Sequence, residues 1–189
     1  RAATADVEWM LGAPVVSADL EAHTVTTIDG REHPWRALVI ATGLRSRRLD
    51  LPLITGRHSV RTLDDAMALR DELIPGARVV VVGAGFIGCE VAATARKLGC
   101  EVTIVAPGAE PLIRPLGAQL GAELRRRHEA HGVTFHLGRT VSAMLGEFEF
   151  GGLQLDDGEI VPGDVLVEAI GSKCNTEWLD ATDLDLSDG

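Results

Sequence analysis

The sequence lacks any long hydrophobic run and is poor in positive charge. None of its apolar stretches approaches the roughly 20 residues that a membrane-spanning helix requires, so we expect no membrane segment. Only 18 Lys and Arg stand against 28 Asp and Glu in 189 residues, which gives a formal net charge of −10. Because phosphate backbones and anionic lipid surfaces attract basic proteins, this balance argues against nucleic acid and against membranes as partners.

Cysteine is scarce and shows no redox spacing. Cys89, Cys100 and Cys174 form neither a C-x-x-C nor a C-x-x-x-x-C pair, so the chain contains no dithiol motif. We expect Cys89 and Cys100 to be small apolar core residues, and unpaired cysteines favour a reducing, cytoplasmic location. His128 and His131 have the i, i+3 spacing of a metal-binding pair, but no third ligand lies near them in the sequence. The sequence therefore predicts no metal site.

What the chain does contain is a glycine-rich segment between an apolar strand and an alanine-rich helix. Residues 78–82 are an arginine followed by four valines, as expected of a central parallel strand that is covered on both faces. Gly83, Gly85 and Gly88 follow at the G-x-G-x-x-G spacing. The first permits a tight turn, the second lets the backbone approach a pyrophosphate, and the third lets helix and strand pack closely.

The helix expected at 88–98 would direct its free N–H groups and the positive end of its dipole toward that pyrophosphate. A purely structural glycine turn is the alternative. The valine-rich strand before the glycines, and the second strand behind the helix, favour a dinucleotide site.

The rest of the pattern predicts an α/β fold with a Rossmann-like doubly wound parallel sheet. The expected helices are 64–73, 88–98 and 116–130. The expected parallel strands are 78–82, a second strand that ends at Val105, and 133–137, and a last apolar strand is expected at 164–170. A three-stranded antiparallel insertion is expected from 140–144, the GEFEF stretch at 146–150 and 153–155, with a tight turn at Asp157-Gly158.

The first part of the chain has a different pattern, of short strands and turns. Asp29-Gly30 marks a hairpin turn, and residues 37–41 form a strongly apolar run that ends in Ala-Thr-Gly. We expect a small antiparallel element that leads into a strand at 37–41.

Five segments, in this order and spacing, resemble the FAD-dependent pyridine nucleotide-disulfide oxidoreductases, and most of all the ferredoxin and rubredoxin reductases of oxygenase systems. They are LVIATG at 38–43, VRTLDDA at 60–66, VVVVGAGFIGCEVAATARKLG at 79–99, GDVLVEAIG at 163–171 and NTEWL at 175–179. In that family an NAD(P)H-binding domain is inserted into an FAD-binding domain.

The resemblance implies how the chain is divided. Residues 1–48 would be part of the FAD-binding domain, 49–171 the NAD(P)H-binding domain, and 172–189 the start of the return to the FAD domain. It also implies an internal piece of a longer protein, because one FAD motif of the family would precede residue 1 and another would follow Gly189. The piece alone is then expected to bind FAD poorly and to be inactive.

The resemblance also assigns site residues. Those around the nucleotide pyrophosphate are Gly83, Gly85, Phe86, Ile87 and Gly88, and those near the nicotinamide are Glu90, Ile170 and Gly171. Glu90 is the candidate catalytic residue, although an acidic residue early in a helix can equally serve to satisfy the helix dipole. Residues expected to line the flavin site are Val15, near the adenine, with Ala41, Thr42, Gly43 and Arg45.

One position departs from the pattern of NAD-binding sites. About 20 residues after the first glycine, such sites carry an acidic residue that accepts hydrogen bonds from the adenosine ribose hydroxyls. Here that position is Ala106, on the adenosine side of the cofactor site. Arg114 is near enough in sequence to reach a 2′-phosphate, and Glu110 could replace the missing acid. The sequence leaves the choice between NADH and NADPH open.

The function that the resemblance implies is transfer of hydride from NAD(P)H to FAD, followed by transfer of electrons to a ferredoxin or rubredoxin-type iron–sulfur protein. A flavoprotein disulfide reductase or NADH oxidase of the same architecture is an alternative, since its redox cysteine would lie before residue 1. A non-catalytic nucleotide-binding scaffold is a third. The identity of the electron acceptor and the oligomeric state stay open.

Overall fold

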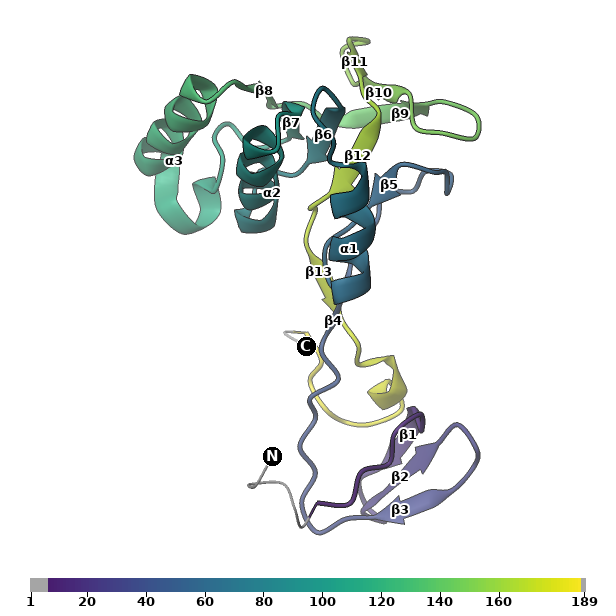
Figure 1. Ribbon diagram of the computed structural model, residues 1–189. Coiled ribbons are helices and arrows are strands. Elements are labelled where there is room, and N and C mark those ends of the chain that lie inside the picture. Colours follow the sequence, from purple (N-terminus) through teal and green to yellow (C-terminus); the bar gives the residue numbers. More distant parts are fainter. Residues whose placement is uncertain (1–6, 188–189) are drawn as a thin grey trace. The chain divides into compact units, whose positions relative to one another are not determined.

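The computed structural model describes residues 7–187 (Figure 1). Residues 1–6 of the expected FAD segment and residues 188–189 at the other end lie outside this range. The described parts of residues 1–44 and 173–189 form one compact unit, and residues 45–172 form a second, larger one. Among the described residues, none of the helices combines the length and apolarity needed to cross a bilayer.

The larger unit is built on a five-stranded parallel sheet. Its strand order is β5 (Arg57–His58), β12 (Val165–Glu168), β6 (Arg78–Val82), β7 (Glu101–Ala106) and β8 (Val133–Leu137). The central strands are almost entirely buried, as their continuous apolar sequences predict, because both faces of the sheet are covered. The α/β fold class is therefore confirmed. The two-residue strand β5 at the edge is an element that the sequence pattern did not predict.

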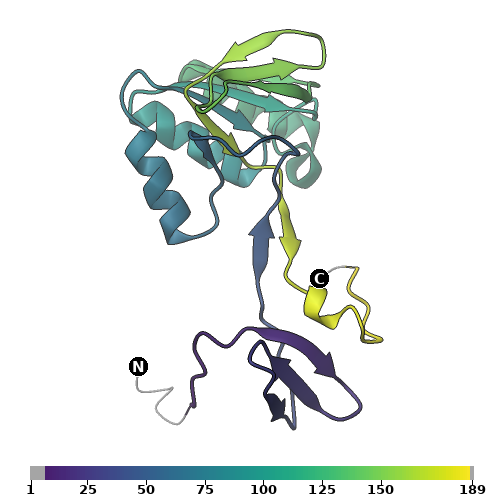
Figure 2. The same ribbon diagram turned by 90° about the vertical axis from the view of Figure 1, so that its right-hand side faces the viewer.

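The two faces of this sheet carry different layers. On one face, side chains of α1 (Leu63–Glu72) and α2 (Phe86–Lys97) join a buried cluster with alternate residues of β6 and β7. On the other face, Phe150 and residues of a small antiparallel sheet complete a second cluster. Figure 2 shows this antiparallel layer and the helices on opposite sides of the parallel sheet.

The helices begin close to the expected residues. A capping box at Thr62 and Asp65 starts α1. Helix α2 begins at Phe86, two residues before the expected start, with Gly85 as its N-cap. Helix α3 (Ile113–Ala130) begins three residues early and is interrupted at Gly117, where the backbone is not helical.

One expectation for the antiparallel sheet is wrong, and it concerns the third strand. The sheet has the order β11 (Ile160–Pro162), β10 (Gly152–Leu155), β9 (Val141–Leu145). Its third strand lies after the Asp157-Gly158 turn, and not in the GEFEF stretch. That stretch is held elsewhere, because the Thr55 amide donates to the Phe148 carbonyl and the Phe150 amide donates to the Thr55 carbonyl.

The smaller unit contains an antiparallel sheet of β1 (Val15–Asp19), β2 (Thr24–Thr27) and β3 (Glu32–Pro34), followed late in the chain by a short 3₁₀ helix, η2 (Glu177–Leu179). The expected turn at Asp29-Gly30 is confirmed. Two short strands, β4 (Leu44–Ser46) and β13 (Ser172–Cys174), lie where the chain passes from one unit to the other.

The strand expected at 37–41 does not form. No described strand pairs with these residues, and Val39 is 86% exposed. An apolar run becomes a strand only where a neighbouring strand completes its ladder of hydrogen bonds, and within residues 7–187 this run has no such neighbour.

Candidate functional site

The glycine loop lies at the carboxyl end of β6 and has the geometry that its spacing predicts. A Cβ added at Gly83, where φ is +110°, would lie 2.3 Å from the carbonyl oxygen of Ala169. A Cβ added at Gly88 would lie 2.0 Å from the carbonyl oxygen of Gly83. At Gly85, by contrast, a Cβ meets no described atom within 4 Å. The outer two glycines are therefore required by packing, whereas the middle one leaves open space in front of the backbone.

That open space faces the amino end of α2. Gly85 caps the helix without any side-chain hydrogen bond from the described residues, so the first amides of α2 have no such acceptor. Phe86 and Ile87 follow at the surface and are 58% and 46% exposed. Because helix amides and the helix dipole favour an anion, this arrangement fits a pyrophosphate at Gly85.

Three parallel strands end at this loop. The Gly83 amide donates to the carbonyl of Val105 at the end of β7, over 2.8 Å. On the other side, the Ala169 amide donates to the carbonyl of Val82, also over 2.8 Å. The segment after β12 that contains Ile170 thus lies directly beside the glycine loop, and Gly171 follows it. Ligands of open α/β sheets bind outside the carboxyl ends of such strands.

A cavity of about 430 Å³ adjoins the glycine loop on the side of β7. Ala84, Gly85 and Phe86 line one side of it. The end of β7 at Ala106 and the start of α3, which includes Arg114, line the other. The structure therefore brings these two sequence-predicted residues together with the glycine loop. The volume suits one half of a dinucleotide.

The loop that closes this cavity is tied directly to the glycine loop. Leu112, just before α3, has a left-handed backbone with φ of +51° and is buried. Its amide donates to the carbonyl of Ala84 over 2.9 Å. This hydrogen bond joins the two loops into one wall of the cavity.

Glu90 lies apart from this cavity. It is exposed on α2 and lines a different hollow, of about 310 Å³, between α1 and α2, together with Leu69 and Leu73. The structure thus separates Glu90, which is expected near the nicotinamide, from Ala106 and Arg114, which are expected at the adenosine.

The residues expected at the flavin lie in two places. Val15 begins β1, and Ala41, Thr42 and Gly43 belong to the irregular segment that follows the third strand of the smaller unit. Thr42 and Asn175 are held together, because the Thr42 hydroxyl donates to the Asn175 carbonyl over 2.7 Å and the Asn175 amide side chain donates back to the Thr42 carbonyl over 3.0 Å. The LVIATG and NTEWL segments thus meet in the smaller unit. Arg45 belongs to β4 and groups with the larger unit.

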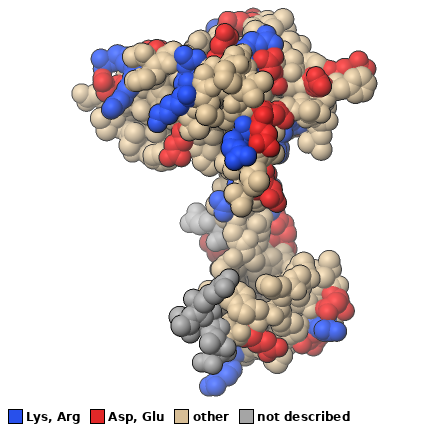
Figure 3. Space-filling view, viewed as in Figure 1, with Lys and Arg blue, Asp and Glu red and all other residues tan. Residues whose placement is uncertain are grey.

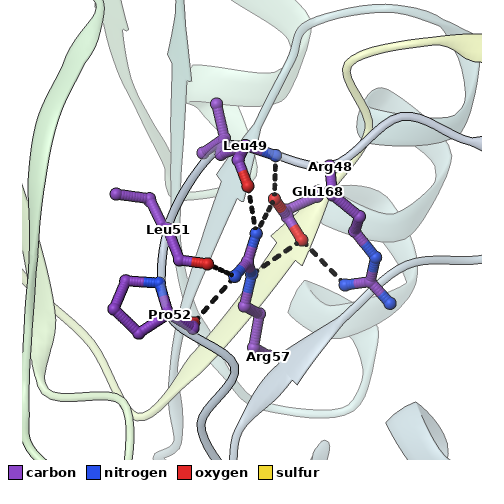
Figure 4. Close-up of polar contacts among 6 residues, drawn as sticks. All are labelled: Arg48, Leu49, Leu51, Pro52, Arg57 and Glu168. Carbon is purple, nitrogen blue, oxygen red and sulfur yellow. Dashed lines mark hydrogen bonds and ion pairs between the residues drawn. The ribbon is translucent and has the colours of Figure 1, made fainter.

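Sequence reasoning missed a buried ion pair at the end of β12 (Figure 4). Both carboxylate oxygens of Glu168 accept hydrogen bonds from Arg57, at 2.9 and 3.0 Å, and Arg48 donates to one of them over 2.7 Å. The Leu49 amide donates to the other oxygen over 2.7 Å. Burial disfavours the charged carboxylate, but these hydrogen bonds outweigh it and hold the pKa of Glu168 below its ordinary value.

Arg57 also fastens the segment that enters the larger unit. Its guanidinium donates to the carbonyl oxygens of Leu49, Leu51 and Pro52. The network therefore joins this entering segment to the strand that leads to Ile170. The sequence signal that could have revealed this ion pair is the glutamate inside the otherwise apolar run VLVEAI.

The expectation that Cys89 and Cys100 are buried is confirmed. Cys89 and Cys100 are buried free thiols, and burial raises the pKa of Cys89 to about 11. Within residues 7–187 no group of three or more metal-ligating side chains comes together. Basic side chains on α3 are interspersed with acidic ones, and the face seen in Figure 3 shows no field of a single sign.

The family of pyridine nucleotide-disulphide oxidoreductases matches the chain over residues 1–189. This chain belongs to that family. Among curated relatives of this chain, the ferredoxin--NAD(+) reductase component of the anthranilate 1,2-dioxygenase system of Burkholderia cepacia is 40% identical, over all of this chain and 49% of the relative. The corresponding subunit of the benzene 1,2-dioxygenase system of Pseudomonas putida is 39% identical, over 89% of this chain and 42% of the relative.

A solved structure of the covalent putidaredoxin reductase–putidaredoxin complex is similar to this chain, with a TM-score of 0.89. The two sequences are 31% identical, and the match covers 94% of this chain and 45% of the solved chain. The present chain thus spans about half the length of the relatives that it matches.

Proposed function

We propose that this chain is the NAD(P)H-binding portion of a flavin-dependent ferredoxin reductase. The protein that contains it would accept hydride from NADH or NADPH on FAD and pass electrons to a ferredoxin or rubredoxin-type iron–sulfur protein. In this proposal residues 49–171 are the NAD(P)H-binding domain, and residues 1–48 and 172–189 belong to the FAD-binding domain. Use of the reduced nucleotide pool, together with free cysteines, supports a cytoplasmic location.

The observation that carries the proposal is the contrast among the three glycines. Backbone atoms leave no room for a side chain at Gly83 or Gly88, whereas Gly85 has open space beside it and begins a helix that has no side-chain cap. A turn with only a structural role has no need of this open space. The names of the relatives, which are ferredoxin reductase components, support the choice of reaction.

The residues of the chain have binding and orienting roles in this reaction. The amides at Gly85, Phe86 and Ile87 would hold the pyrophosphate, and the cavity beside Ala106 would take the adenosine. The segment at Ile170 and Gly171, fixed to the glycine loop, would limit where the nicotinamide can lie. Bound FAD supplies the hydride acceptor and the single-electron donor. The protein contributes orientation and exclusion of water, so no side chain of the chain needs to act as a nucleophile.

Glu90 is proposed to lie near the nicotinamide, where its charge would help to position the ring. Its exposure on α2, away from the cavity at Ala106, is compatible with this role. Replacement by glutamine removes the charge and keeps the shape. We expect slower reduction of the flavin at unchanged nucleotide affinity in Glu90→Gln.

The test uses the protein that carries this chain, isolated with its flavin. NAD(P)H-dependent reduction of a [2Fe–2S] ferredoxin is measured beside reduction of disulfides and of oxygen. The proposal predicts that the ferredoxin is the fastest acceptor. Rapid turnover with a disulfide or oxygen alone would favour a disulfide reductase or NADH oxidase, and nucleotide binding without any turnover would favour a scaffold.

A further inference from the structure

We propose that Arg114 binds the 2′-phosphate of adenosine and makes this site prefer NADPH to NADH. The inference rests on the proposed function, in which the cavity beside β7 takes the adenosine half of the nucleotide. NADH and NADPH differ only at this ribose, so the charged groups that face the cavity decide between them.

The end of β7 offers no acceptor for ribose hydroxyls. Ala106 is its last residue and lines the cavity, at the place where sites that prefer NAD carry Asp or Glu. Pro107 and Gly108, which follow, also lack side-chain acceptors. A ribose 2′-hydroxyl therefore gains nothing from these three side chains, and a 2′-phosphate meets no carboxylate that would repel it.

Glu110 is the acidic residue that could replace the missing one, but its carboxylate is already engaged. Arg125 on α3 donates to both of its oxygens, from Nε over 2.8 Å and from Nη2 over 3.2 Å. Gly121 permits this close approach, because a Cβ there would lie 2.9 Å from the Cβ of Glu110 and 2.7 Å from the Pro111 carbonyl oxygen.

The Glu110 side chain is only 16% exposed in this pair. Its carboxylate is held in a bidentate, partly buried ion pair, the stronger kind of charged hydrogen bond, so a ribose hydroxyl would have to share it with Arg125. Its charge is partly offset by Arg125, which weakens its repulsion of a phosphate.

Arg114 is in the opposite situation. It is the second residue of α3, exposed, and lines the same cavity. It makes no ion pair with any described residue, whereas Arg125 is paired with Glu110 and Glu129, and Arg139, after β8, is paired with Asp156 and Asp157.

Glu110 and Arg114 are the charged residues among the side chains that line the cavity. The Glu110 carboxylate is held by Arg125, whereas the Arg114 guanidinium is left to face the ligand. A 2′-phosphate is nearly a dianion with several acceptor oxygens, and arginine binds such groups through paired hydrogen bonds. The relatives named above are ferredoxin--NAD(+) reductases, so the inference sets this chain apart from them.

The test is calorimetric titration of the 189-residue chain with NADPH and NADH, and with 2′,5′-ADP and 5′-AMP as probes of the adenosine half alone. We expect NADPH to bind at least about tenfold more tightly than NADH, which is the range of one charged hydrogen bond. The same ratio is expected between the two probes.

Three variants test whether the preference for NADPH comes from Arg114. Arg114→Ala should abolish the preference by weakening NADPH and 2′,5′-ADP binding about tenfold or more, with NADH changed less than about twofold. Arg127→Ala is the matched control, because it removes the same charge from the same helix at a residue that lines a different cavity. Ala106→Asp should reverse the preference toward NADH by restoring the ribose acceptor.

The outcomes distinguish a failure of the NADPH preference from a failure of the proposed nucleotide site. Equal affinities, or tighter binding of NADH, would overturn the inference and leave the proposed function standing. Equal loss of both nucleotides in Arg114→Ala would give this residue a general role and also overturn the inference. Failure of both nucleotides to bind the unaltered chain would contradict the inference and the proposed nucleotide site together.

Discussion

Replacement of Gly85 by valine should separate binding from folding at the glycine loop. The backbone at Gly85 has φ −81° and ψ −172°, an extended conformation that valine adopts readily. Its added Cβ meets no described atom within 4 Å. Valine is a poorer N-cap than glycine, so we expect a loss of about 1 kcal/mol in the free energy of unfolding. In a chain of this size that corresponds to a shift of roughly 2–4 °C in Tm.

The expected effect on nucleotide affinity is much larger. The valine side chain fills the space in front of the helix amides and displaces the pyrophosphate from about two charged hydrogen bonds, each contributing about 1.5–3 kcal/mol. A loss of about 3 kcal/mol or more is a fall in affinity of at least about 100-fold. Calorimetry with NADPH measures the affinity, and thermal unfolding followed by circular dichroism measures Tm.

The neighbouring glycines provide the contrast. Gly83→Ala and Gly88→Ala place a Cβ 2.3 Å and 2.0 Å from backbone carbonyl oxygens, so strand and helix must separate. We expect these variants to lose well over 2 kcal/mol of stability. Unchanged affinity in Gly85→Val would refute the assignment of this loop to the pyrophosphate, and a Tm loss as large as that of Gly88→Ala would refute the claim that the space is open.

Three further predictions concern the rest of the chain. Glu168→Gln should lower the free energy of unfolding by about 3 kcal/mol at pH 7, because it leaves two arginines beside an uncharged side chain. The folded pKa of Glu168 lies below its ordinary value of about 4.3, so the stabilisation by the charged carboxylate is complete above that pH and is lost as the pH falls through the folded pKa. Denaturant unfolding should therefore give a difference in stability between wild type and variant that narrows below about pH 4 and not above it. Thr62→Ala should remove the cap of α1 and cost about 1 kcal/mol, seen as a lower denaturation midpoint with unaltered NADPH affinity, and a change in affinity would contradict this. Cys89 and Cys100 should react with a thiol reagent only after unfolding, whereas Cys174, which is half-buried, should react first; counting the thiols modified over time in the native chain checks the order.

The sequence predicted those elements whose pattern is strong and local. The valine strand at 78–82, the glycine spacing and the alanine-rich helix each carry their own signal within a few residues, and they were placed correctly. The apolar run at 37–41 carries an equally strong local signal, yet it forms no strand, because a strand also depends on a partner.

Long-range pairings were the part that local patterns could not supply. The GEFEF stretch alternates as a strand does, but its backbone is paired with Thr55, far away in the chain. The ion pair of Arg57 with Glu168 joins residues 111 positions apart. At the candidate site the sequence identified Ala106, Glu110 and Arg114 as the residues that matter. Only the fold shows that Arg125 engages one of them and that Arg114 has no carboxylate partner among the described residues.

The most direct test of the central claim is a crystal structure of the chain grown with NADP⁺ or NADPH at saturating concentration. We predict the pyrophosphate within hydrogen-bond distance of the amides that follow Gly85, and the adenosine in the cavity beside Ala106, with its 2′-phosphate on Arg114. A nucleotide bound anywhere else, or a glycine loop that stays free of nucleotide at that concentration, would contradict the account.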